Sequence, residues 1–164
     1  MKKILIPTDF TTSSLQLIEY AILNYPEKAL EIVLVHGYKV SEQRNTLRNF
    51  SPSKVVYQMA DAFFDNEIDN FLVEHKDSIA GIRYELYTGS TVADFNKFLE
   101  QQKIEAAILP NSCFLSLPSS KSFSMHSLIK QHVAHVSEIN LGNKEDTFLQ
   151  RNSFTSRDVN ANNH

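Results

Sequence analysis

Hydroxyl-bearing and acidic residues gather at two places where the sequence predicts that a buried strand ends. The first is the segment PTDF, in which Thr8 and Asp9 follow the apolar run at residues 3–7. The second is LPNSCFLSLPSSKSFS, residues 109–124, which follows the apolar run at residues 105–109. Hydroxyls and a carboxylate at strand ends suit the ribose and phosphates of a nucleotide. Both segments are candidates for a ligand site, and the second has no glycine.

The remaining residues with reactive side chains do not form a catalytic or metal-binding set. His126, His132 and His135 are close in sequence, but no carboxylate or cysteine completes them at ligand spacing. Cys113 has no neighbouring His or Lys to lower its pKa, which favours an incidental thiol. His36 ends an apolar strand and is interpreted as a hydrogen-bonded core residue. We therefore predict no metal site, no catalytic residue and no enzymatic activity.

Composition and charge exclude several classes of protein. The chain has 164 residues, 42% hydrophobic and 21% charged, with a net charge of −3. This balance supplies no basic field to attract nucleic acid or an anionic membrane. The amino-terminal apolar run is only Ile4, Leu5 and Ile6 before Pro7, too short for a secretory signal. No apolar run is long enough for a membrane span. A cytoplasmic protein is expected.

Short apolar runs alternate with segments of helical period. Runs rich in Ile, Val, Leu or Tyr predict five strands, at residues 3–7, 29–36, 82–87, 105–109 and 132–139. Apolar residues three to four apart predict helices at residues 12–25, 51–72, 91–99 and 123–131. Thr91 and Asp94 have the spacing of a capping box. This alternation predicts an α/β fold with a five-stranded, mostly parallel, doubly wound (Rossmann-like) sheet and helices on both faces.

The chain is predicted to hold one domain and a tail. Residues 1–139 contain the alternating elements, whereas residues 140–164 are polar and aperiodic and are expected to be disordered or loosely docked. The connection at residues 37–53 is longer than is usual after a strand of such a sheet.

Four segments resemble the universal stress protein family. They are KKILIPTDFTTSSLQLIEYAI at the start, IVLVH in the second strand, YTGS before the third helix and IEAAIL at the fourth strand. The resemblance covers residues 2–139. It implies that ATP, where members bind it, lies over the carboxyl ends of the first and fourth strands. Carried over to this sequence, the adenosine contacts are Pro7, Thr8, Asp9 and Gly37. Asp9 is equally well interpreted as the cap of the first helix.

The same resemblance implies a glycine motif around the triphosphate. An ungapped alignment puts Pro110, Cys113, Phe123 and Ser124 at its four positions, so only the hydroxyl of Ser124 is retained. Glycine is needed there because the main chain must approach phosphate closely. No glycine occurs between Ser90 and Leu141. A degenerate site without tight ATP binding is therefore predicted, and the serines between Ser112 and Ser127 are interpreted as a solvated loop.

The function expected from the resemblance is that of a regulatory or interaction protein in a stress response, with no obligatory cofactor. The alternative is a sensor of a small adenine nucleotide, AMP or ATP, that uses the turn of Pro7, Thr8 and Asp9, with a serine such as Ser124 on a phosphate. A homodimer is expected, either through the last strand, which commonly forms the dimer edge in the family, or by a different geometry, together with an unidentified protein partner. His135, Ser137 and Glu138 interrupt the apolar pattern of this strand.

Overall fold

The alternating elements build a parallel sheet. The computed structural model describes residues 1–26, 29–40, 50–60, 62–111 and 117–140. Within them, five parallel strands lie in the order β3-β2-β1-β4-β6, and a short β5 pairs antiparallel with β2. The strands are β1 (Lys2–Pro7), β2 (Leu30–Tyr38), β3 (Ile79–Tyr87), β4 (Ala106–Pro110), β5 (Ser122–Phe123) and β6 (Val136–Ile139). The predicted doubly wound topology is confirmed.

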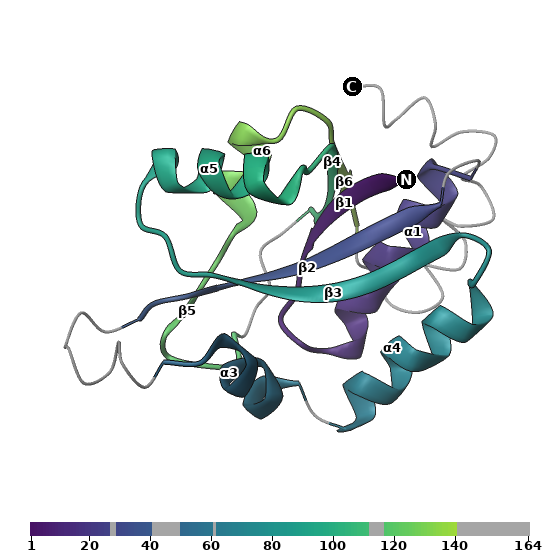
Figure 1. Ribbon diagram of the computed structural model, residues 1–164, viewed down its shortest axis with the longest axis horizontal. Helices are drawn as coiled ribbons and strands as arrows, with labels where there is room; N and C mark the ends of the chain where they lie inside the picture. Colours follow the sequence, from purple (N-terminus) through teal and green to yellow (C-terminus); the bar gives the residue numbers. More distant parts are fainter. Residues whose placement is uncertain (27–28, 41–49, 61, 112–116, 141–164) are drawn as a thin grey trace.

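Helices cover both faces of the sheet, because side chains alternate along each buried strand. Ile4 of β1 and Ile32 of β2 face α1, α3 and α4, whereas Leu5 and Val33 face α5 and α6. Figure 1 shows these two helical layers on opposite sides of the strands. The helices are η1 (Thr12–Leu15, a 3₁₀ turn), α1 (Gln16–Asn24), α3 (Pro52–Met59), α4 (Ala62–Glu74), α5 (Val92–Gln102) and α6 (His126–His132). None of these helices is long and apolar enough to cross a bilayer.

The start of α5 follows the predicted capping box. Thr91 Oγ1 accepts a hydrogen bond from Asp94 N at 3.1 Å, and Asp94 Oδ2 accepts one from Thr91 N at 3.1 Å. The Ser90 amide also donates to Asp94 Oδ2 at 3.0 Å. The bonds from Ser90 and Thr91 hold the pKa of the Asp94 carboxyl below its ordinary value. The cap fixes where α5 leaves the carboxyl end of β3.

Two predicted helices differ from the structure. The helix predicted over residues 51–72 is two helices, because Ala60 has extended backbone at φ −86° and ψ 107°. Val56, Ala60 and Phe64 are spaced four residues apart and all contribute to the same core cluster. The helical spacing of apolar residues therefore continues through the break, and the sequence gives no sign of the break. The first predicted helix begins as the 3₁₀ turn η1.

The segment at residues 123–139 is also arranged differently from the prediction. Phe123 belongs to β5 and not to a helix, and His132 ends α6 and does not start a strand. The last strand is therefore only Val136–Ile139. A two-residue strand such as β5 is too short to give a periodic signal. In the predicted tail, residues 141–164 lie outside the described part of the chain, as do residues 41–49 of the long connection.

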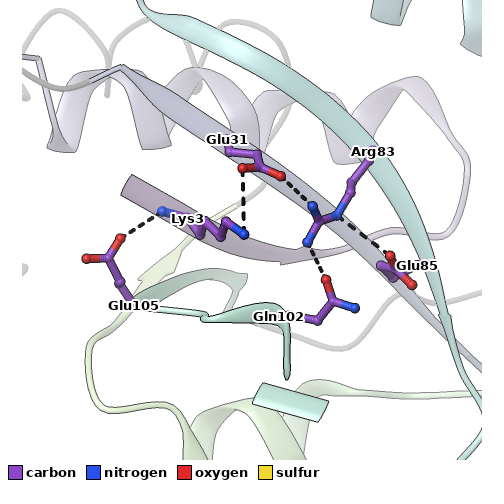
Figure 2. Close-up of polar contacts among 6 residues, drawn as sticks. All are labelled: Lys3, Glu31, Arg83, Glu85, Gln102 and Glu105. Carbon is purple, nitrogen blue, oxygen red and sulfur yellow. Dashed lines mark hydrogen bonds and ion pairs between the residues drawn. The ribbon is translucent and has the colours of Figure 1, made fainter. Parts of the chain in front are cut away.

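Charged side chains form a row across the strands on the α5 face (Figure 2). Glu31 of β2 accepts from Arg83 of β3 and lies 3.8 Å from Lys3 Nζ of β1. Arg83 also donates to Gln102 at the end of α5, and its Nε lies 3.6 Å from Glu85 Oε1. The Glu31 side chain is only 19% exposed, so its charge requires these partners. The row joins three neighbouring strands to α5.

Candidate functional site

The predicted ligand residues meet at the carboxyl ends of β1 and β2. Pro7 is the last residue of β1, is buried, and is paired in register with Val35 of β2. The next amide, that of Thr8, donates to Val35 O at 2.9 Å. Pro7, Thr8, Asp9 and Gly37 therefore lie at one edge of the sheet, as the sequence predicts for neighbouring parallel strands.

The Thr8 hydroxyl makes its hydrogen bonds within the protein. Thr8 is 2% exposed, and its Oγ1 accepts from Phe10 N at 3.0 Å. It also lies 3.0 Å from Ser14 Oγ, whose own proton is donated to Thr11 O at 2.7 Å. Thr8 is thus the donor to Ser14, and both the donor and an acceptor site of its hydroxyl are used.

Asp9 acts as a cap for the turn that follows β1. Its Oδ1 accepts from Thr11 N at 3.0 Å and from Thr11 Oγ1 at 2.6 Å. Such an Asx turn fixes the chain two residues ahead of the carboxylate. Phe10, between them, has a positive φ of 63°, uncommon for a residue with a side chain. Its ring lies 5.1 Å from the His36 ring and 5.8 Å from the Phe64 ring, so packing holds this conformation.

His36 of β2 connects the residue after β1 with β5. Its ring is buried, with Nδ1 2.8 Å from Thr8 O and Nε2 2.6 Å from Ser122 Oγ. A carbonyl oxygen only accepts, so the neutral ring carries its proton on Nδ1 and accepts from the Ser122 hydroxyl at Nε2. The prediction that His36 is a hydrogen-bonded core residue is confirmed.

This His36–Ser122 pair has the form of a base beside a nucleophile, and no motif in the sequence indicates it. The two residues are 86 positions apart, and only the β5–β2 pairing brings them together. The Ser122 amide donates to Ser119 O at 3.0 Å, so it is not free to stabilise an oxyanion. Together with the His36 bond to Thr8 O, the pair connects the residue after β1 to β2 and β5.

Gly37 lies under Phe123 of β5. The two residues are partners in the antiparallel pair, and Tyr38 is the partner of Ser122. A Cβ atom on Gly37 would lie 2.6 Å from the Phe123 ring and 2.7 Å from Phe123 O. Phe123 also packs against Tyr87, with ring centroids 6.2 Å apart. Gly37 is thus needed for the close approach of β5, which covers the residue that the resemblance assigned to adenosine.

Among the described residues, the positions that the resemblance implies for a triphosphate are occupied by residues with side chains and not by glycine. Pro110 ends β4, is buried and has no amide hydrogen to donate. Ser124 Oγ accepts from His126 N at 3.3 Å, at the start of α6. Cys113 lies outside the described part of the chain.

The histidines near α6 are not arranged around a metal. His126 Nε2 lies 3.0 Å from Pro110 O and 3.7 Å from Glu138 Oε1, and Lys130 Nζ lies 3.0 Å from the same carboxylate oxygen. In the described ranges, no group of three His, Cys, Asp or Glu side chains is placed to hold a metal ion.

Burial lowers the pKa of His36 below its ordinary value of 6.5, against the opposing effects of the Thr8 carbonyl and the Asp9 carboxylate. A lowered folded-state pKa means that the unfolded chain binds the proton more readily. The contribution of neutral His36 to stability is therefore complete above about pH 6.5 and falls as the pH drops below it. We expect His36→Gln to flatten the pH dependence of the free energy of unfolding between pH 7 and pH 5. Urea titrations of both proteins at several pH values test this, and equal slopes would contradict it.

The fold and this site define the class of protein: a doubly wound α/β domain in which β5 pairs with the carboxyl end of β2. In solved structures, the hypothetical protein MJ0577 aligns with 19% identity over 87% of this chain and 98% of its own, with a TM-score of 0.51. A universal stress protein family member from Burkholderia pseudomallei aligns with 12% identity over 84% and 95%, TM-score 0.47. UspA from Lactobacillus plantarum aligns with 17% identity over 85% and 97%, TM-score 0.46.

Over most of its length the chain thus shares the α/β fold of MJ0577. The α/β fold that the sequence predicts is confirmed. No protein-family model matches the chain, and a search of curated proteins finds no match.

Proposed function

We propose that this chain is a universal-stress-protein-like regulatory protein that acts in the cytoplasm by binding itself and a partner protein. It works without catalysis and without tight ATP binding. The observation that carries the proposal is the covering of Gly37 by Phe123. Adenosine bound at Gly37 would have to displace β5 and break the His36–Ser122 hydrogen bond.

The other candidate contacts support the same conclusion. Thr8 Oγ1 and Asp9 Oδ1 already bond to Ser14, Phe10 and Thr11, so binding a ribose through these two atoms would first break those bonds. Breaking internal hydrogen bonds to form new ones leaves little net affinity. Phosphates would meet the buried Pro110, which has no N–H group to offer.

Isothermal titration calorimetry with ATP, ADP and AMP tests the proposal. We expect no measurable heat, or dissociation constants in the millimolar range for all three nucleotides. A thermal unfolding curve of the same sample establishes that the protein is folded. A micromolar dissociation constant for ATP would overturn the proposal.

A sensor of a small adenine nucleotide is the second candidate. It is favoured by the arrangement of Pro7, Thr8, Asp9 and Gly37 at one edge of the sheet. In this case β5 would act as a displaceable cover. The same titration separates the two: micromolar binding of AMP with a clear preference for its phosphate over adenosine would support the sensor.

A further inference from the structure

One edge of the sheet is long and is not paired in the described part of the chain. β3 (Ile79–Tyr87) is at the end of the strand order and pairs with β2 on its inner side. At the opposite edge, β6 is four residues long. An open strand edge presents unpaired amide and carbonyl groups and is a template for another strand. β3 offers this template over nine residues.

The surface beside the carboxyl half of β3 is hollowed. A groove of about 520 Å³ lies between α3 and residues Tyr84, Glu85 and Leu86. A smaller depression of about 260 Å³, lined by Met1, Glu31 and residues 80–83, lies toward β1 and β2 and not beyond the edge. An added strand therefore has room for side chains beside residues 84–86.

Exposed apolar residues gather on the helices beside this strand. Tyr57 of α3 is 82% exposed, and Phe63 and Val73 of α4 are 63% and 74% exposed. Both helices pack on β3. Single exposed apolar residues are ordinary, so these three show only that the helices beside β3 leave some apolar surface exposed.

The sequence of β3 is complementary to itself in one antiparallel register. When two copies pair about Tyr84, Arg83 of each copy lies opposite Glu85 of the other, and Ile82 lies opposite Leu86. Opposite charges and apolar pairs across a strand pair stabilise it. Centring the pair on Arg83 or on Glu85 would instead oppose two like charges. The charges therefore disfavour these two neighbouring registers and favour the one centred on Tyr84.

We propose that this protein forms a two-fold dimer by antiparallel pairing of β3 with β3 of a second copy, centred on Tyr84. Within one chain, Glu85 Oε1 lies 3.6 Å from Arg83 Nε, beyond hydrogen-bond distance, and in the dimer the Glu85 carboxylate of the second copy is added to the charges around Arg83. A two-fold axis makes each contact occur twice. The dimer joins the two sheets into one. The inference rests on the self-association in the proposed function and assigns it to β3, where the sequence analysis expected the last strand.

A pair of matched charge reversals tests which edge is used. Glu85→Arg places Arg opposite Arg83 in the β3 pair, whereas Glu138→Arg makes the same change on β6. Sedimentation equilibrium of the full chain measures the dimer dissociation constant, and thermal unfolding establishes that each variant is folded. We expect Glu85→Arg to raise the dissociation constant at least about tenfold, and Glu138→Arg to leave it unchanged.

Cysteine crosslinking tests the register and does not depend on the charge variants. In a Cys113→Ser background, the double variant Ile82→Cys/Leu86→Cys places thiols opposite each other, at a Cα separation of about 5 Å. We expect it to form a covalent dimer on mild oxidation. The single variant Ile82→Cys is the control, because residue 82 is far from its own copy in this register and should not crosslink.

The outcomes separate this inference from the proposed function. A dimer that is lost in Glu138→Arg but kept in Glu85→Arg, without crosslinking of the double variant, overturns the β3 assignment and leaves self-association in place. A wild-type chain that stays monomeric at every concentration overturns both the assignment and self-association. Neither result affects the predicted lack of ATP binding, which calorimetry tests.

Discussion

Gly37→Ala is expected to lower the free energy of unfolding by about 1–3 kcal/mol. The new methyl carbon would lie 2.6 Å from the Phe123 ring and 2.7 Å from Phe123 O. The ring can move, but the carbonyl belongs to the backbone of β5, so the strand pair itself must open. Urea unfolding followed by circular dichroism measures the change.

Gly81→Ala is the matched control for this substitution. Gly81 lies in β3, next to β2, and a Cβ there would meet nothing within 4 Å. We expect it to be neutral or to stabilise the protein by up to about 1 kcal/mol, because alanine restricts the unfolded chain. An equal loss of stability in both variants would show that the contact with Phe123 is not the cause.

Phe95→Ala is expected to have the larger effect, a loss of about 3–5 kcal/mol in the free energy of unfolding. Phe95 of α5 is 0% exposed, and its ring meets Tyr87 edge-on at a centroid distance of 5.3 Å. Tyr87 in turn packs against Phe123. The variant therefore removes a buried ring that packs against Tyr87, which in turn contacts Phe123 beside Gly37.

The neighbouring Phe98→Ala serves as the control for Phe95→Ala. Phe98 also contacts Tyr87, at 5.5 Å, but is only partly buried. Because the Phe98 side chain buries less apolar surface on folding, we expect Phe98→Ala to lose roughly half as much stability as Phe95→Ala, or less. Chemical unfolding of the two variants under the same conditions compares them. A smaller loss for Phe95→Ala than for Phe98→Ala would contradict the packing account.

The local features predicted from the sequence are those that neighbouring residues determine. Thr91 and Asp94 are three positions apart, so their capping box was predictable from spacing. His36 ends an apolar run, which indicated a buried ring with satisfied nitrogens. The helix break at Ala60 was not predictable, because it preserves the periodicity on both sides.

The chain by itself determined the class of fold: its alternating apolar runs and helical periods allow few arrangements besides a parallel sheet covered on both faces. Through the family resemblance, it also predicts that Pro110 and Phe123 stand at positions where a phosphate-binding motif would have glycine. Only the tertiary structure showed which residues cover Gly37 and bond to His36. The bond between His36 and Ser122 and the packing of Phe123 on Gly37 depend on two residues of β5 reaching β2 across the fold. Such contacts join distant residues through a strand too short to have a period, so their signal exists only in three dimensions.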